Sequence, residues 1–343
     1  MIATTKSAPI RVGITGVGSC VPDTIVTNDD IAERVQTNHE WIVERTGIHQ
    51  RHVAGPGVAA SDLSVPAAEL ALKRAGLDAS DIDLVIVATI TPDMPFPATA
   101  SVVADRIGAG KVAAYDLQAG CTGFVYALTQ AYSTIVAGLA ARVLVVGVDL
   151  LTNYVDWDDR GTCILFGDGA GAAIVEEVPT GGFLSFELGN DGAGVEDLYV
   201  PAGGTRQPAS EATVAANDHT MRMNGRKVFK FATRVMVTSA QRALDAAGFE
   251  PADVDLYVPH QANKRIIDHA VRALGIPEEK VVVNVDRFGN TSAASIPICL
   301  DEMAEAGQLT AGARVLMTGV GTGLSWGSAL IDWPGEANGG SSA

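Results

Sequence analysis

The sequence predicts an α/β protein made of two similar halves, packed in layers of helix, sheet, helix, sheet and helix. An internal repeat is the first reason. Residues 71–148 recur without a gap at 243–320, and Asp83 to Asp255 and Ala141 to Ala313 have the same offset of 172 residues. Short, nearly continuous runs of Val, Ile and Leu are the second reason, because such strands belong to sheets covered on both faces. The third is composition: 47% of the residues are hydrophobic and only 19% charged, which suits a large core.

The first half contains a regular alternation of helix and strand. Its sequence predicts a helix at 62–75, strands at 83–89 and 111–117, a helix at 123–137 and a strand at 141–148. We expect the second copy to repeat this order.

The chain divides near residue 180. We predict an N-terminal half at 1–180 and a C-terminal half at 181–333, with a Gly- and Pro-rich connecting stretch around 179–211. Residues 334–343 have the composition of a linker, and we predict a disordered tail there.

Composition excludes several functions. The net charge of −16 disfavours nucleic-acid binding, since phosphodiesters repel such a chain. There is no secretory h-region at the N-terminus and no apolar run of about 18 residues, so we expect no membrane association. The four cysteines form no CxxC pair and the six histidines no HExxH. A cytoplasmic enzyme without metal or cofactor is the simplest interpretation.

The two copies differ where chemistry is expected. Cys121 aligns with Ala293, and His260 aligns with Ala88. Asn290, in turn, aligns with Gln118. Each of the three polar residues follows a predicted strand and precedes a helix, the position where α/β sheets place ligand-binding groups. This asymmetry predicts an active site at the pseudo-two-fold interface.

Cys121 is the candidate nucleophile. It opens a predicted helix within the segment D-L-Q-A-G-C-T-G-F-V. A free thiol is only slightly ionised at neutral pH, and we expect the helix N-terminus, together with a nearby histidine, to lower its pKa. Free cysteines are usually structural, and that interpretation is kept for the other three, Cys20, Cys163 and Cys299.

His260 and Asn290 complete the candidate set. Each alone has a simpler explanation as a capping or turn residue, and for Asn290 that explanation would prevail. Three such residues at three separate strand-to-helix turns favour a catalytic set instead. Papain-like hydrolases also combine cysteine, histidine and asparagine, but this chain lacks their C-G-S-C-W-type signature and has a different predicted layout. The segment G-D-G-A-G-A at 167–172 lacks the spacing of a dinucleotide-binding loop.

Several motifs together resemble the β-ketoacyl-acyl carrier protein synthase III family of the thiolase superfamily. They are A-G-C-T-G-F-V-Y-A-L, V-P-H-Q-A-N, G-N-T-S-A-A-S, H-E-W-I-V-E-R-T-G-I, T-P-D-M-P-F-P, D-R-G-T, F-G-D-G-A-G-A-A and S-W-G-S-A-L. The likeness spans about residues 10–333. It implies a five-layered thiolase fold and a homodimer.

The resemblance also implies a reaction. Cys121 takes an acyl group from an acyl-CoA primer, and malonyl-acyl carrier protein then loses carbon dioxide and attacks the thioester, which starts fatty-acid synthesis. His260 and Asn290 are implied as donors to the malonyl thioester oxygen, and the backbone N–H groups of Cys121 and Thr322 as the oxyanion hole for the acyl carbonyl. Thr322 stands where the family often has a smaller residue.

The resemblance assigns the binding residues as well. Trp41 and Arg160 would sandwich the adenine of CoA, and the channel would be lined by Thr37, Arg45, Gly161, Phe229 and Asn263. The carrier protein would dock on Lys230, Arg265 and Arg272. Phe96 would reach into the acyl pocket of the partner subunit.

Two alternatives remain open at this stage. A relative in secondary metabolism would load a starter unit or transfer an acyl group without decarboxylation; the intact triad favours carbon–carbon bond formation. A non-catalytic partner subunit typically loses the cysteine, which is present here.

Overall fold

A computed structural model describes residues 10–335 of the chain. The predicted disordered tail lies outside the described residues, except for Pro334 and Gly335. No helix in the described part is long and apolar enough to cross a bilayer. A cytoplasmic location stays a prediction.

The first sheet has five strands in the order β1 (Val12–Cys20), β7 (Asp168–Glu177), β6 (Arg142–Leu150), β4 (Leu84–Ala88) and β5 (Ala113–Leu117). β4 is parallel to both β5 and β6, whereas β7 is antiparallel to β6 and β1. Every residue of the run L-V-I-V-A in β4 is buried, as predicted for a strand covered on both faces.

The second sheet has the order β11 (Leu256–Pro259), β12 (Arg314–Gly321), β13 (Ser325–Asp332) and β8 (Gly182–Asn190). Strand β8 lies inside the Gly- and Pro-rich stretch 179–211 that separates the two copies, so the first part of this stretch belongs to the second sheet. β8 pairs along its length with β13, and its Phe183, Phe186 and Leu188 pack on the core. These contacts outweigh the weak strand propensity of the glycines.

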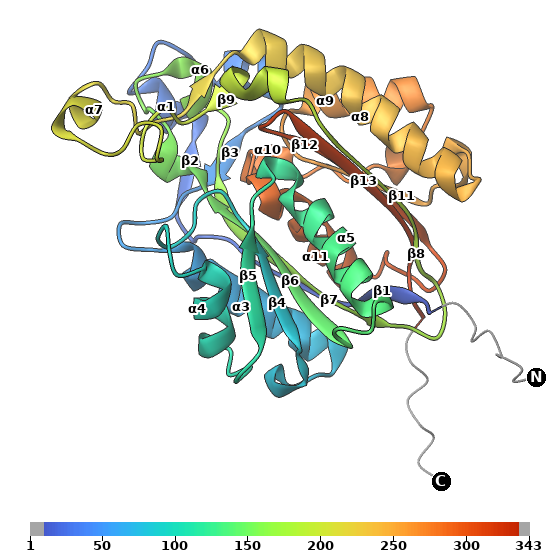
Figure 1. Cartoon of the computed structure of the whole chain (residues 1–343). Helices are drawn as coiled ribbons and strands as arrows, with labels where there is room; N and C mark the ends of the chain where they lie inside the picture. Colours follow the sequence, from blue (N-terminus) through green and yellow to red (C-terminus); the bar gives the residue numbers. More distant parts are fainter. Residues whose placement is uncertain (1–9, 336–343) are drawn as a thin grey trace, which may run out of the picture.

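Helices cover both sheets and fill the space between them. α3 (Ala60–Ala75) and α4 (Thr99–Arg106) lie on the outer face of the first sheet, and α8 (Gly225–Ala247) and α9 (Lys264–Leu274) cover the second. α5 (Gly123–Val136) and α11 (Ser295–Glu305) form the middle layer (Figure 1). The predicted five-layered α/β fold is confirmed.

The sequence repeat is also a structural repeat. β4, α5 and β6 correspond to β11, α11 and β12, and α3 and α8 end at equivalent residues, Ala75 and Ala247. One element breaks the correspondence: residues equivalent to β5 form α10 (Val285–Phe288), and the edge of β11 carries only the isolated bridge Tyr257–Val281. The domain boundary near residue 180 stays a prediction.

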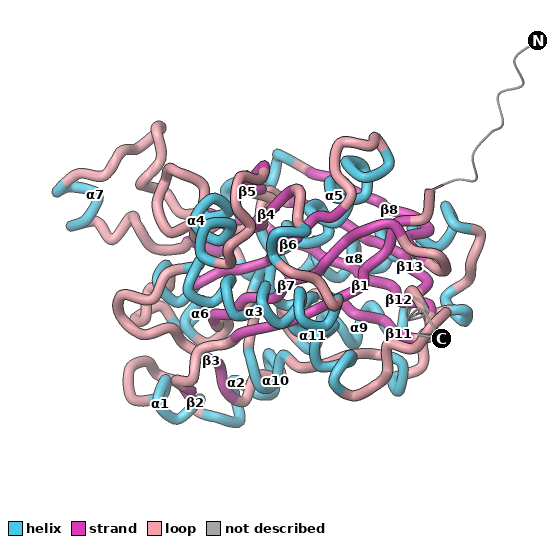
Figure 2. The backbone as a smooth tube through the Cα atoms, turned by 90° about the horizontal axis from the view of Figure 1, so that it is seen from below, coloured by secondary structure: helices cyan, strands magenta, loops and turns pink. Residues whose placement is uncertain are grey.

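Short strands, helices and 3-10 turns between these elements complete the fold. The strands and helices are β2 (Ile25–Thr27), α1 (Asn28–Ala32), α2 (His39–Thr46), β3 (Gln50–His52), α6 (Arg160–Cys163), β9 (Leu198–Tyr199), α7 (Glu211–Ala215) and β10 (Arg222–Met223). The 3-10 turns are η1 (Ala79–Asp81), η2 (Gly120–Thr122), η3 (Leu151–Tyr154), η4 (Gly192–Asp197), η5 (Pro251–Asp253), η6 (Glu278–Lys280) and η7 (Ser292–Ala294). The segment that carries α7 projects from the body of the molecule (Figures 1 and 2).

Candidate active site

Cys121 lies in the turn η2, directly before α5, and only 6% of it is exposed. The preceding Gly120 has φ +57°, and a Cβ there would lie 2.5 Å from Cγ2 of Thr322 and 3.0 Å from its backbone nitrogen. Glycine is therefore required for the loop at Thr322 to approach the cysteine. The structure brings together the two residues expected to form the oxyanion hole. The hydroxyl of Thr322 donates to the carbonyl of Leu198, so its methyl group is the part that faces Gly120.

His260 follows the last residue of β11 and is 2% exposed. Its backbone N–H donates to the carbonyl of Thr318 on β12, which holds it at the end of the sheet. Its Nδ1 lies 2.6 Å from the hydroxyl of Ser295, and the backbone N–H of Gln261 donates to the same hydroxyl oxygen at 3.4 Å. The hydroxyl hydrogen is therefore assigned to Nδ1, which leaves the proton of the neutral ring on Nε2. Burial lowers the pKa of His260 to about 3, so the ring is a neutral donor at physiological pH.

Asn290 is held by backbone hydrogen bonds on both sides. Its N–H donates to the carbonyl of Leu165 at 2.9 Å, and its carbonyl accepts from Gly167 at 3.1 Å. The side-chain Oδ1 accepts from the backbone N–H of Ser292 at 2.9 Å. Since the oxygen is used, and Nδ2 has no hydrogen bond within residues 10–335, the amide nitrogen is the group left to donate to a substrate.

One turn connects the three predicted catalytic residues. Ser292 in η7 lies 3.4 Å from the sulfur of Cys121 and binds Asn290, and Ser295 at the start of α11 binds His260. Both serines belong to the G-N-T-S-A-A-S motif, which sequence reasoning used only as a run of small residues. The spacing of the two serines, which places both on one side of a helical turn, was the sequence signal that could have indicated this role.

The predicted lowering of the Cys121 pKa is wrong for this structure. Burial raises the pKa of the thiol to about 12, the negative charge of Asp149 adds to the rise, and the hydrogen bond from Ser292 opposes it. Loss of hydration disfavours the thiolate more than one helix terminus can favour it. His260 is neutral and supplies no compensating charge. Cys121 is therefore a thiol at neutral pH, and the proton has to leave as the sulfur attacks.

The residues expected to bind CoA are only partly brought together. The guanidinium carbons of Arg45 and Arg160 each lie 4.7 Å from the ring centroid of Trp41, and Arg160 also donates to the carbonyl of Gln36. Asn263 donates to the carbonyl of Arg45 at 3.0 Å. A purine can enter between Trp41 and Arg160 only if this guanidinium moves away, because the two groups are already stacked.

The other predicted CoA residues surround this cluster. Gly161 follows Arg160 in α6, and its N–H donates to Asp159. The hydroxyl of Thr37 is buried without a hydrogen-bond partner among the described residues. Phe229 lies apart, on α8, beneath the guanidinium of Arg265 at 5.4 Å.

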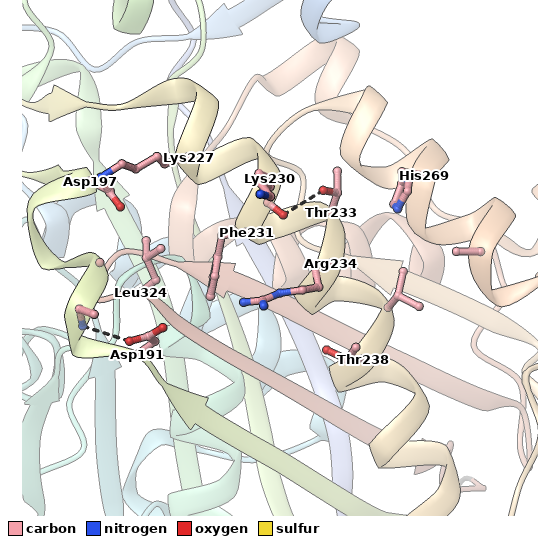
Figure 3. A pocket seen from close by; sticks show the side chains of 14 residues that line it. Asp191, Asp197, Lys227, Lys230, Phe231, Thr233, Arg234, Thr238, His269 and Leu324 are labelled. Atoms are coloured by element: carbon pink, nitrogen blue, oxygen red, sulfur yellow. Dashed lines mark hydrogen bonds and ion pairs between the residues drawn. The ribbon is translucent and has the colours of Figure 1, made fainter.

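The residues expected to bind the carrier protein are exposed on α8 and α9. Lys230, Arg265 and Arg272 make no ion pair within the described part of the chain. Lys230 also lines a groove of about 740 Å³ between η4, α8 and α9 (Figure 3). The same groove contains Arg234 and His269, two basic residues that the sequence did not single out. These two residues come together only because α8 packs against α9, and a local sequence motif does not show that packing.

Phe96 lies on the loop between β4 and α4 and is 84% exposed. Within residues 10–335, its side chain is left largely uncovered. Of the described residues, no three His, Cys, Asp or Glu are grouped as a metal site would require. The absence of a cofactor stays a prediction.

Comparison with known proteins identifies the relatives of this chain. Two family models match, 3-oxoacyl-[acyl-carrier-protein] synthase III over residues 115–192 and its C-terminal part over residues 244–333. A β-ketoacyl-[acyl-carrier-protein] synthase III of Desulfitobacterium hafniense is 54% identical over 325 residues, covering 94% of this chain and 98% of the relative. The corresponding protein of Symbiobacterium thermophilum is 50% identical over 323 residues, with coverage of 94% and 98%.

Solved structures similar to this chain belong to the same kind of enzyme as the relatives found by sequence. The β-ketoacyl-[acyl-carrier-protein] synthase III of Thermus thermophilus has a TM-score of 0.87 at 47% identity, covering 94% of this chain and 99% of that one. The priming β-ketosynthase of the R1128 polyketide pathway has a TM-score of 0.88 at 36% identity, covering 97% and 100%. The two-sheet architecture is thus that of the thiolase-fold enzymes. The chain belongs to the 3-oxoacyl-[acyl-carrier-protein] synthase III family and is an acyltransferase, as its motifs predict.

The depressed pKa of His260 makes folding stability depend on pH. Between about pH 6.5, where an unfolded histidine titrates, and about pH 3, the unfolded chain binds a proton that the folded chain does not. The free energy of unfolding is therefore expected to fall as the pH drops through this window, with a contribution of up to about 1.4 kcal/mol per pH unit. Urea denaturation at pH 7, 6 and 5 measures it.

The H260Q variant should lose this contribution and show a shallower pH dependence than the native chain. H269Q, which changes an exposed histidine, serves as the control and should keep the native slope. Equal slopes for H260Q and the native chain would contradict a buried neutral His260.

Proposed function

We propose that the protein condenses an acyl-CoA primer with malonyl-acyl carrier protein through an acyl-Cys121 intermediate, and so initiates fatty-acid synthesis. One observation carries the proposal: a buried thiol, the Nε2–H of a neutral imidazole and the Nδ2 of an asparagine are held around one turn, residues 292–295. Such a set offers one nucleophile and two uncharged donors, which suits a thioester whose oxygen becomes negative.

In the first half of the reaction, the sulfur of Cys121 attacks the acyl carbonyl of the primer. The carbonyl oxygen becomes an oxyanion and is stabilised by the backbone N–H groups of Cys121 and Thr322. The carbon–sulfur bond to CoA then breaks, and the CoA thiolate takes the proton that Cys121 loses. The products are acyl-Cys121 and CoA.

In the second half, the malonyl thioester loses carbon dioxide and its oxygen gains negative charge. Nε2–H of His260 and Nδ2–H of Asn290 donate to that oxygen. The carbanion attacks the acyl carbonyl, the bond to Cys121 breaks, and the sulfur regains a proton from water. A neutral donor is suitable here because it stabilises the enolate without protonating it.

One of the related structures suggests a second function for the same site. The priming β-ketosynthase of a polyketide pathway matches over 97% of this chain, so loading of a starter unit for secondary metabolism is the alternative. Assaying a panel of acyl-CoA primers side by side distinguishes the two by the primer that is preferred.

Substitution of Asn290 separates the two half-reactions. The N290A variant should still form acyl-Cys121 but condense about 100- to 1000-fold more slowly, because one of two oxyanion donors is lost. Mass spectrometry of the protein after incubation with primer, followed by measurement of carbon dioxide release with malonyl-acyl carrier protein, reports both steps.

C121A should show no acyl adduct and no condensation, whereas C20A, at a cysteine on β1, should keep both. A native protein that forms acyl-Cys121 without releasing carbon dioxide would exclude condensation and favour simple acyl transfer.

We propose that the carrier protein docks on α8 and α9 through Lys230, Arg265 and Arg272. The patch attracts an acidic partner against the −16 charge of the whole chain, so the attraction is local and screened by salt.

Raising ionic strength should therefore weaken carrier binding strongly, as measured by titration at several salt concentrations. Substituting each cation by alanine should weaken binding and flatten the salt dependence, whereas K73A, at an exposed position of α3, should do neither. Salt-independent affinity would rule out this docking mode.

We also propose a homodimer in which Phe96 of one subunit closes the acyl pocket of the other. Strand β5 is an edge strand that pairs only with β4, and Tyr115 on it is 38% exposed. Phe96 and Met94 are exposed on the loop that follows β4. An unpaired edge beside exposed apolar side chains is a place where a second chain adds.

A mixed dimer tests the contribution of Phe96. F96A should keep the dimeric state but change the preference for primer length. In a mixed dimer of F96A with C121A, the only active cysteine faces an intact Phe96 from its partner, so the native preference should return. Failure to return would place the action of Phe96 within its own subunit.

A further inference from the structure

Ser292 has an unusual backbone conformation. It opens the turn η7, is fully buried, and has φ +53°. Among the described residues other than glycine, only Asn217 shares a positive φ, and asparagine tolerates that region. A serine held there is strained, and strain of this kind is kept where the surroundings determine it, often at functional sites.

The left-handed conformation directs two groups of Ser292 into the active site. The backbone N–H donates to Oδ1 of Asn290 at 2.9 Å. The hydroxyl oxygen lies 3.4 Å from the sulfur of Cys121. The same residue therefore contacts the nucleophile and one of the two donors.

A buried carboxylate contacts the turn that carries Ser292. Asp149 on β6 is fully buried, and its Oδ1 accepts from the hydroxyls of Thr89 and Thr91 and from the backbone N–H of Ile90. Its Oδ2 lies 3.4 Å from the backbone nitrogen of Ala293, next to Ser292.

The charged groups around the thiol are few. The charge of Asp149 raises the pKa of Cys121, and His260 at the end of β11 is neutral. Tyr154 in η3 also faces Asp149, and burial together with that charge raises its pKa, so it too is uncharged. Burial raises the pKa of both Cys121 and Asp149, and the hydroxyl of Ser292 opposes the rise in each.

We propose that Ser292 is a positioning residue whose hydroxyl donates to the sulfur of Cys121 as negative charge develops there. The proposal rests on Cys121 as the nucleophile. No proton is transferred by Ser292; its O–H group donates a hydrogen bond to the sulfur and stays intact. This hydrogen bond stabilises the thiolate.

The S292A variant tests the hydroxyl and keeps the backbone N–H that holds Asn290. Alkylation of Cys121 by iodoacetamide, mapped by mass spectrometry between pH 6 and 9, should be about 10- to 100-fold slower at each pH, because a hydrogen bond to a charged group is lost. Acylation by the primer should slow in parallel. Carbon dioxide release by enzyme that has first been fully acylated should change little, since His260 and Asn290 remain and the sulfur carries no negative charge in that step.

The S292G variant separates the hydroxyl from the backbone. Glycine adopts a positive φ without strain, so S292G should fold at least as well as S292A. Its rate of Cys121 alkylation should fall to the same extent, because the hydroxyl is absent from both variants. Native alkylation by S292G or S292A would overturn the proposal. S64A, at a buried serine of α3 whose hydroxyl donates to the carbonyl of Ala60, is the matched control and should alkylate normally.

Asp149 is tested in a double-mutant cycle. D149N should speed alkylation, because burial and the charge of Asp149 raise the pKa of the thiol. S292A should slow alkylation by the same factor in both backgrounds, because the hydroxyl acts directly on the sulfur. A loss of the S292A effect in the D149N background would contradict a direct action of Ser292 on the sulfur. Alkylation needs no substrate, so a failure here is distinguishable from a failure of the condensation assay.

Discussion

The close approach of two helix starts in the middle layer is the constraint on which the rest of the site depends. The turns η2 and η7, which open α5 and α11, meet at the centre of the molecule. A Cβ on Gly147 would lie 2.3 Å from the carbonyl oxygen of Ala293, and one on Gly123 would lie 3.0 Å from Cβ of Ala88. Only glycine and alanine allow this packing, and because of it the sulfur of Cys121 faces Ser292.

The chemistry of the site follows from burial. Cys121, His260 and Asn290 are almost entirely removed from solvent, and Asp149 is completely buried. In such surroundings charged forms are unfavourable, so the histidine is neutral and the cysteine is a thiol. The site therefore consists of oriented dipoles, and its strength lies in donors placed where charge develops during the reaction.

Much of this site was accessible from the sequence. Cys121, His260 and Asn290 were found because each differs from its counterpart in the repeat and each follows a strand. Ser292, Ser295 and Asp149 were missed, since serine in a small-residue motif and aspartate at the end of a strand carry no distinctive local signal. The thiol pKa was predicted in the wrong direction, because a helix terminus is visible in sequence and the extent of burial is not. Strand β8 was hidden by its glycines.

The sequence by itself determined the duplicated α/β architecture, the family and the three residues at strand ends, because hydrophobic periodicity, repeat register and local motifs are properties of short segments. The tertiary structure alone decided which groups around Cys121 touch it, what charge each carries, and that one strained serine connects the nucleophile with a donor. Those features arise from contacts between β6, η2 and η7, which are far apart in the chain and meet only when two sheets pack around one pair of helices.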